Sequence, residues 1–359
     1  MFSSKSFWLG VFFSFLGFLL AFEIFLWITI PTGFWYQYLD ISGDLTSLSE
    51  LQDRIRYAYP LQRPLFLLGD SVLGASALTE HRIPQSRSKT LTRALTTRLM
   101  TLHQTVLSLG SDGNLLTDIL ALNSEIHPQS EDHILLLLNF RMFAQEFADG
   151  SKGLSRYFLE PDLPQDIQNR LIPDSLPTQE TKLSDDLYTL MCRHWFLFRE
   201  TQMMKTLWYY PSQKDFYQRL LENIVGTNDA QADMIEAALK QKIASYYQPY
   251  VWDKKALAFT CLQKLLDSWV ANHVHGTVVL TPQNQKFLGD YLDKPSFKKN
   301  RILLANFMKA YVSQGIRYED WADHYPASMF LDHCHLTPEG NEKYGNDLMR
   351  LLEGFKNDE

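Results

Sequence analysis

A serine follows directly on a short apolar segment of the chain. The stretch "FLLGDS" ends at Ser71, and its apolar part is typical of a strand that is buried on both faces of a parallel sheet. Much later in the chain, "DHCH" carries Asp332 and His335 three positions apart. A serine hydroxyl becomes nucleophilic when a histidine takes its proton and a carboxylate orients that histidine. These three residues therefore predict nucleophilic catalysis by Ser71.

Two other strand ends carry groups that can donate hydrogen bonds. The segment "SLGSDGN" holds Gly113, and glycine lets the backbone turn tightly and present an N–H to a reacting atom. The segment "ILLLLN" ends at Asn139, whose side-chain amide is a donor. In open α/β sheets, ligands bind at the carboxyl ends of the strands. We expect both residues to face the same space as Ser71.

The elements that must position these residues alternate along the chain. Helical patterns at 91–103 and 114–126 lie between short apolar segments, and "TPE" begins a terminal helix after His335. This alternation predicts a three-layer α/β/α sandwich around a parallel sheet. The predicted strands are 65–68, 105–109, 134–138 and 277–280.

The rhythm changes between about 145 and 260, where helix-forming and aromatic residues dominate. We interpret this region as a helical insertion between the third and fourth strands, forming a lid or side lobe. Most of its aromatic residues are expected in a core. A substrate groove or a membrane-facing patch is the alternative.

The segment from Phe7 to Ile30 is apolar except for Glu23. As a helix it would be about 36 Å long at 1.5 Å per residue, enough to cross a hydrocarbon core of roughly 30 Å. A cleaved signal peptide is the competing interpretation, but its apolar region is normally shorter and precedes a small-residue cleavage site. The segment "PTGFWYQYL" that follows here has no such site, so the sequence favours an uncleaved transmembrane anchor.

The flanking charges predict how this anchor is oriented. Lys5 precedes it, and the next basic residue after it is Arg54. The positive-inside rule then places residues 1–6 in the cytoplasm, 7–30 in the cell membrane as a single span, and 31–359 outside the cytoplasm.

Composition excludes several classes of function. The chain is 45% hydrophobic and 21% charged, as folded proteins are, and its net charge of -7 provides no basic footprint for nucleic acid. Three widely spaced cysteines form no zinc-type cluster, so neither a metal nor a cofactor is predicted. The cysteines, Cys192, Cys261 and Cys334, are expected to be buried thiols.

The order of these motifs resembles that of the SGNH (GDSL-type) hydrolase superfamily. "GDS" matches its first block and "DHCH" its last, which implies a flavodoxin-like fold with Ser71 as nucleophile, His335 as base and Asp332 as its partner. The resemblance also implies an oxyanion hole that includes the backbone N–H of Gly113 and the side chain of Asn139. His333 and Cys334 within the last block are expected to pack rather than react. Arg141 is expected in a structural salt bridge, with binding of an anionic substrate group as the alternative.

The third block departs from the family pattern. It usually reads Gly-x-Asn-Asp, whereas this chain has "LLNF"; a literal "GTND" at 226–229 follows a helical pattern rather than a strand and is interpreted as a coincidence. Similar departures are found in membrane-anchored cell-envelope branches, which include the D-alanyl transfer protein of teichoic acid synthesis and exopolysaccharide acetyltransferases.

The resemblance implies a membrane-anchored enzyme that acts on acyl esters of an envelope glycan or lipid. Hydrolysis and O-acyl transfer both remain open, and a membrane-bound acyltransferase is an expected partner if the acyl group is transferred. The altered third block keeps a different class open as well: a catalytically inactive envelope assembly or binding protein on the same fold.

Overall fold

The computed structural model describes residues 4–29, 65–144 with short breaks, 164–169, 243, 246–247, and 250–353 without 290–291. The chain divides into two compact units, one of Met1–Leu39 with Gln179–Val225 and the other of Asp40–Thr178 with Gly226–Glu359. Most of the predicted insertion at 145–260, including "GTND" and Cys192, lies outside the described residues. The predicted domain limits therefore stay a prediction.

In the first unit, residues Ser4–Thr29 form helix α1. Its side chains are described from Val11 to Phe25, and large apolar ones such as Phe15 and Phe18 are exposed. Within the described part of the chain, no helix combines the length and the apolarity that a membrane span requires.

In the second unit, a parallel sheet has the spatial order β2-β1-β3-β4-β5, which is the order of flavodoxin-like sheets. Four of its strands overlap the predicted ones. The fifth, absent from the predicted strands, has the sequence "RYED" and is only half buried. It forms one edge of the sheet, and β2 forms the other. The strands are β1 (Leu65–Leu68), β2 (Val106–Ser108), β3 (His133–Leu138), β4 (His275–Leu280) and β5 (Arg317–Asp320).

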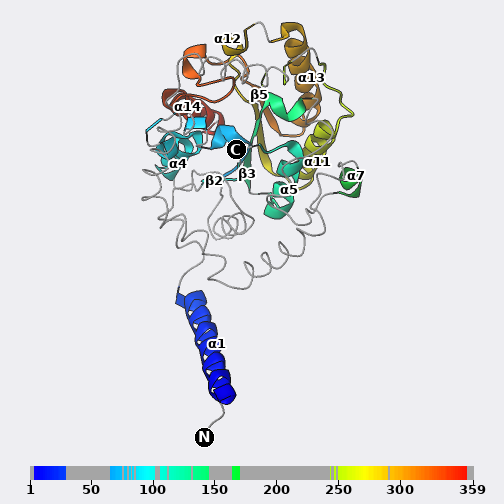
Figure 1. Cartoon of the computed structure of the whole chain (residues 1–359). Coiled ribbons are helices and arrows are strands. Elements are labelled where there is room, and N and C mark those ends of the chain that lie inside the picture. Colours follow the sequence, from blue (N-terminus) through cyan, green and yellow to red (C-terminus); the bar gives the residue numbers. More distant parts are fainter. Residues whose placement is uncertain are drawn as a thin grey trace. The chain divides into compact units, whose positions relative to one another are not determined.

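Successive side chains of the strands enter two separate apolar cores, as the period of two in a strand requires. Leu65 and Leu67 belong to one core, and Phe66 and Leu68 belong to the other. Both cores are covered by helices, which is why the strands carry continuous apolar runs (Figure 1). The predicted α/β architecture with a parallel sheet is confirmed.

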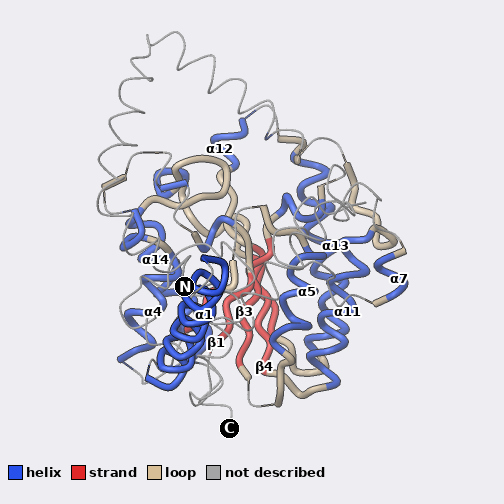
Figure 2. Tube along the Cα trace, turned by 60° about the horizontal axis from the view of Figure 1, so that its bottom comes forward, coloured by secondary structure: helices blue, strands red, loops and turns tan. Residues whose placement is uncertain are grey.

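The helices cover the sheet in two groups (Figure 2). On one side lie α4 (Leu91–Thr101) and α14 (Pro338–Glu353), which contact each other. On the other lie α5 (Leu116–Ile126), α11 (Leu257–Ala271) and α13 (Lys294–Val312). The short helices are η2 (Ser71–Leu73), η3 (Ser86–Lys89), η4 (Phe140–Phe143), α7 (Gln165–Gln168), α12 (Gln285–Leu288) and η8 (Ala327–Met329).

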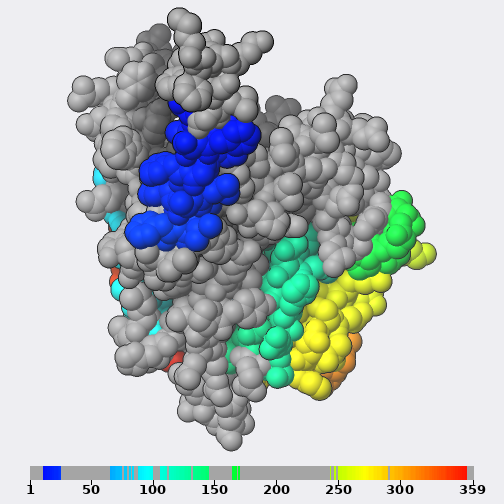
Figure 3. All heavy atoms as spheres, turned by 90° about the horizontal axis from the view of Figure 1, so that it is seen from below, coloured from blue at the N-terminus to red at the C-terminus, as the bar shows by residue number. Residues whose placement is uncertain are grey.

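Buried polar contacts join α5 to α11. The indole Nε1 of Trp269 donates to Asn123 Oδ1 over 2.8 Å, and Asn123 Nδ2 donates to Ser268 Oγ over 3.2 Å. In the space-filling view these two helices lie side by side, with α7 against α11 (Figure 3). This group is therefore fixed by directional bonds as well as by apolar packing.

Side-chain caps set where the helices begin. The Thr337 hydroxyl accepts the N–H of Gly340 over 3.1 Å, so α14 starts directly after the "DHCH" loop. Asp293 caps α13 in the same way through the N–H of Ser296, at 2.9 Å. The predicted "TPE" helix start is confirmed, and the start of α14 at Pro338 sets where the loop that carries His335 ends.

Candidate active site

The chain turns sharply where β1 ends. The Asp70 side chain accepts the N–H of Val72 over 3.3 Å, and this bond starts the short helix η2 at Ser71. The turn packs tightly against the end of β2: a Cβ on Gly110 would lie 2.9 Å from Leu73 Cβ and 3.2 Å from the Asp70 carbonyl oxygen. Glycine at this position lets β2 approach the turn that carries the serine.

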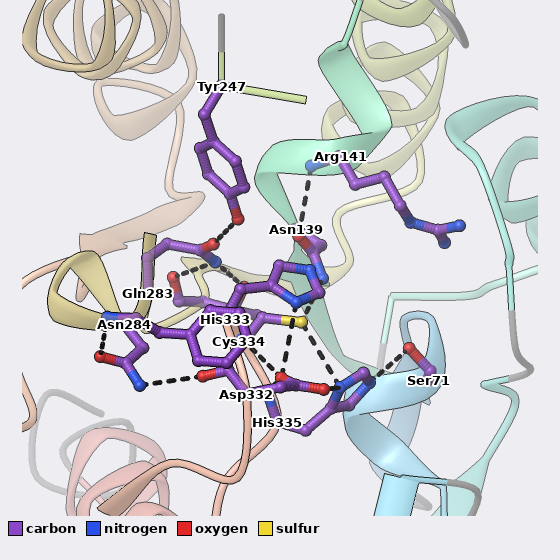
Figure 4. A network of polar contacts seen from close by, with 12 residues as sticks. Ser71, Asn139, Arg141, Tyr247, Gln283, Asn284, Asp332, His333, Cys334 and His335 are labelled. Carbon is purple, nitrogen blue, oxygen red and sulfur yellow. Dashed lines mark hydrogen bonds and ion pairs between the residues drawn. The ribbon is translucent and has the colours of Figure 1, made fainter. Parts of the chain in front are cut away.

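Ser71, His335 and Asp332 form one continuous chain of hydrogen bonds (Figure 4). Ser71 Oγ lies 2.8 Å from His335 Nε2, and His335 Nδ1 lies 2.7 Å from Asp332 Oδ2. The serine and histidine are 264 positions apart in the sequence, so the fold alone brings them together. This is the geometry that a histidine needs to take a serine proton while a carboxylate holds its other ring nitrogen.

The loop that carries Asp332 and His335 is closed on itself. Asp332 Oδ1 accepts the backbone N–H groups of Cys334 and His335, over 2.9 and 2.8 Å. The Leu331 N–H donates to the His335 carbonyl oxygen over 2.8 Å, at the base of the loop. Both carboxylate oxygens are thus occupied, and the side chain has one orientation in which all its bonds are made.

Asn284, which follows β4, fastens this loop to the sheet. Its side-chain Nδ2 donates to the Asp332 carbonyl oxygen over 2.9 Å, and its backbone N–H donates to the His333 carbonyl oxygen over 2.7 Å. Asn284 Oδ1 accepts the Phe287 N–H over 3.1 Å, which fixes the amide orientation. A fourth strand end therefore contributes to the site.

Asn139 and Gly113 lie at the neighbouring strand ends. Asn139 Oδ1 accepts the Arg141 N–H over 3.2 Å, which turns its Nδ2 towards Cys334 Sγ, 3.5 Å away. Gly113 has a φ of 82°, a left-handed conformation that favours glycine. Asn139 is thus adjacent to the loop of the triad, and Gly113 lies beside Arg141. Their roles as oxyanion donors stay predictions.

Arg141 connects the loops after β1, β2 and β3. Its Nη2 lies 3.2 Å from Asp70 Oδ2 and donates to the Asn114 carbonyl oxygen over 3.4 Å. Asn114 Nδ2 in turn donates to the Gly69 carbonyl oxygen over 3.0 Å. Asp70 is fully buried, so its charge needs this partner. The predicted salt bridge of Arg141 is confirmed.

The electrostatics of the loop favour a charged Asp332. Burial alone would raise the pKa of this carboxyl, but His335, by its charge and its hydrogen bond, and His333, by its charge, hold it well below its usual range. Burial would lower the pKa of His335, yet the negative charges of Cys334 and Asp332 and the hydrogen bonds to them raise it well above 6.5. The resting site therefore favours a carboxylate beside an imidazolium.

Cys334 packs beside the hydrogen-bonded side chains of Asp332 and His335. It is buried as expected, and so is Cys261, but Cys334 Sγ also lies 3.8 Å from His335 Nδ1. Burial would raise its pKa, whereas the charges of His333 and His335 lower it to about 7. The thiol is thus part of the charge balance around His335. The thiol lies beside titratable groups and, because it can carry a charge, it influences their pKa values; an apolar side chain in its place would carry no such charge.

Asn284 and Asn114 were missed as functional residues in the sequence. The pattern that predicted Ser71 and Asn139 also applies to them, because each is a polar residue in the loop that follows a strand. Both side chains act on backbone carbonyl groups rather than on a reacting atom, so no catalytic motif singles them out.

Comparisons with known proteins give matches among solved structures. No protein-family profile matches the chain, and no curated protein matches it. Among solved structures, a member of the lipolytic protein G-D-S-L family from Veillonella parvula aligns with a TM-score of 0.36 and 10% sequence identity. The alignment covers 81% of this chain and 98% of that one.

The raised pKa of His335 predicts how serine reactivity depends on pH. A histidine that must accept the Ser71 proton has to be neutral, so the rate of Ser71 labelling by a fluorophosphonate should rise with pH and reach half its maximum above pH 6.5. In Cys334→Ala, which removes one of the negative charges, this midpoint should move to lower pH. A midpoint at or below pH 6.5 in the wild type would contradict the charge arrangement described above.

Replacing Asn284 should slow labelling because the triad loop loses its tether. Asn284→Asp keeps the acceptor for Phe287 but removes the donor to Asp332, and we expect the labelling rate constant to fall about ten- to a hundredfold. The matched control is Asn300→Asp. Asn300 also donates to a backbone carbonyl and accepts a backbone N–H, but away from the triad. Equal losses of labelling in two folded variants would show that Asn284 has no positioning role.

Proposed function

We propose that this chain is a serine esterase or O-acyltransferase that acts on acyl esters through Ser71, His335 and Asp332. The observation that carries the proposal is the continuous hydrogen-bond chain from Ser71 Oγ to Asp332 Oδ2. Its support does not depend on the similarity to solved structures. It rests on residue types, distances and burial that together meet the requirements of an activated serine.

The reaction follows from the positions of the three side chains. Ser71 Oγ attacks the acyl carbonyl carbon while its proton passes to His335 Nε2. The resulting imidazolium is stabilised by Asp332 and then gives the proton to the leaving alkoxide, so that an alcohol departs and Ser71 retains the acyl group. Water or a glycan hydroxyl next attacks the acyl-serine, His335 accepts its proton, and Ser71 regains that proton as the product leaves.

The negative charge that develops on the carbonyl oxygen needs donors at the same edge of the sheet. The proposed donors are the backbone N–H groups of Ser71 and Gly113 and the side-chain amide of Asn139. One good donor of this kind contributes about 3–4 kcal/mol to transition-state stabilisation. The amide of Asn139 has a sulfur as its partner in the resting state. A sulfur is a weak acceptor, so the amide can be released to a stronger one, such as an oxyanion.

Hydrolysis and transfer differ in the acceptor that reaches the acyl-serine. The proposed substrates are acyl esters of an envelope glycan or lipid, and a membrane-bound acyltransferase would be the source of acyl groups for transfer. The support for this finer assignment is the apolar segment 7–30 and the long region between β3 and β4. A catalytically inactive assembly or binding protein is the alternative that the altered third block leaves open.

Labelling with a fluorophosphonate distinguishes an enzyme from an inactive relative. The wild-type chain should take up one label, detected as a mass increase on the peptide that contains Ser71, and Ser71→Ala should take up none. Ser313→Ala provides the control, because this hydroxyl bonds only a helix carbonyl in the described structure. A folded wild-type protein that stays unlabelled would leave the inactive alternative as the better one.

We also propose that residues 7–30 anchor the chain in the cell membrane, with the sheet-containing unit outside the cytoplasm. Supporting this, α1 carries apolar side chains around its circumference, including Phe12, Phe13 and Phe15, each 60% exposed. A helix that is apolar on every side is normally surrounded by lipid or by protein. Lys5 before the helix sets the orientation under the positive-inside rule.

A topology reporter tests this orientation. A phosphatase that is active only outside the cytoplasm, fused after Glu359, should be active, and the same fusion lacking residues 1–30 should lose most of that activity. The matched fluorescent reporter, which folds only in the cytoplasm, should show the opposite pattern. A fluorescent full-length fusion would overturn both the orientation and the envelope substrate class.

A further inference from the structure

Three different metal-ligand types converge beside the triad. Asp332, His333 and Cys334 are all buried, and one potential ligand atom from each lies within 4.8 Å of the other two. The sequence predicts no metal site here because its three cysteines are far apart and no Cys-x-x-Cys pair occurs. The cluster arises from consecutive residues in a closed loop, which is a spacing that no zinc motif uses.

His333 Nδ1 faces this cluster and lies within ion-pair distance of Asp332. This nitrogen is buried and has no hydrogen-bond partner among the described residues, although it lies 3.5 Å from Asp332 Oδ1. A buried imidazole nitrogen normally has a partner, because leaving it without one costs about 1–3 kcal/mol. Figure 4 shows the ring of His333 on the side of Cys334 opposite His335, directed at the same space as the sulfur.

We propose that Asp332, His333 and Cys334 bind a thiophilic divalent cation, with Zn²⁺ as the best fit, and that the bound cation switches the triad off. This inference concerns regulation of the proposed serine site and rests on that function for its inhibitory part. Zn²⁺ accepts thiolate, imidazole and carboxylate ligands together, and three protein ligands leave its fourth position for water. Mg²⁺ and Ca²⁺ prefer oxygen ligands and do not suit this set.

One ligand distance fits a tetrahedral ion as it stands, and the other ligand atoms lie within 4.8 Å. Zn–N and Zn–O bonds of about 2.0–2.2 Å put two ligand atoms roughly 3.4 Å apart at a tetrahedral angle, close to the 3.5 Å between His333 Nδ1 and Asp332 Oδ1. The sulfur needs a longer bond of about 2.3 Å. Binding releases to solvent the proton that the Cys334 thiol or His333 Nδ1 carries, since a thiolate and a neutral imidazole nitrogen are the ligands.

Inhibition follows from what Asp332 Oδ1 already does. This oxygen accepts the N–H groups of Cys334 and His335, and these bonds hold the loop in the conformation that places the His335 ring. A cation bound to Asp332 Oδ1 occupies a lone pair of this oxygen, so one of the two hydrogen bonds from the N–H groups is lost. The loop must then shift, and His335 Nε2 moves from its 2.8 Å contact with Ser71 Oγ.

Direct binding is tested first and does not require an active serine. Cd²⁺ added to the full chain carrying Ser71→Ala should produce the ultraviolet charge-transfer band of a cadmium–thiolate bond, and Zn²⁺ should displace it. The band should be lost with Cys334→Ala and retained with Cys261→Ala, the matched control for a buried thiol in α11. A band that survives Cys334→Ala, or no band in a folded protein, would overturn the site.

The inhibitory part is tested with buffered Zn²⁺ and the fluorophosphonate. Each variant is compared with itself with and without Zn²⁺, so differences in basal rate cancel. Zn²⁺ should slow labelling of the wild type at least tenfold, EDTA should restore it, and His333→Gln should need at least about tenfold more Zn²⁺ for the same inhibition.

The two experiments separate failure of this proposal from failure of the proposed function. A Cys334-dependent cadmium band in a protein that takes no label would support the cation site and refute the enzyme. Normal labelling that Zn²⁺ does not slow, in a protein that shows the cadmium band, would refute the inhibitory role.

Discussion

The parallel pairing of β1, β3 and β4 is the constraint on which the rest of the site depends. Leu68 pairs with Leu136, and Leu138 pairs with Leu280, so these strands end close together at one edge of the sheet. In the order β2-β1-β3, the chain passes from β1 to β2 on one side of β1 and then to β3 on the other side. The loops that follow β1 and β3 therefore diverge, and a crevice opens between them. A single change of register would move Ser71 and Asn139 away from one another and exchange the faces that enter the two cores.

Within that frame, hydrogen bonds to backbone groups fix the loops that carry Ser71, Asp332 and His335. Asp332 is fixed by two N–H groups of its own loop, and the loop is fixed by Asn284. Arg141 performs the same task on the opposite side, where it ties the exit of β1 to the loop after β2 through Asp70 and Asn114. The loops that carry Ser71 and His335 are therefore held by two separate sets of hydrogen bonds, each anchored at a different strand end.

Much of this arrangement could be predicted from the residues. The continuous apolar runs identified β1 to β4, because strands covered on both faces carry apolar residues at successive positions instead of alternating with polar ones. Ser71, His335 and Asp332 could be predicted as a group because their chemistry requires one another. Strand β5 could not, since "RYED" has no apolar run and has the composition of a surface loop.

The contacts of Asn284 and Cys334 could not be predicted for a different reason. Each depends on how two distant loops pack, and no local preference determines that. Asn284 acts on Asp332 across 48 positions of sequence, and Asn139 reaches Cys334 across 195. Such contacts exist only once the distant loops have packed together in the folded chain. The residue types by themselves would suit an asparagine in any loop or a cysteine in any core.

The long sequence separation within the triad also bears on how the chain folds. Strands β3 and β4 are neighbours in the sheet, yet Leu138 and His275 are separated by the longest excursion between adjacent strands, so their pairing must bear a large loop-closure entropy. Non-local contacts of this kind form slowly. Ser71 precedes that excursion and His335 follows it, so their contact depends on the closed sheet. A nascent or partly folded chain thus contains Ser71 with no imidazole beside it, and the 2.8 Å contact between the two side chains reports that the sheet has closed.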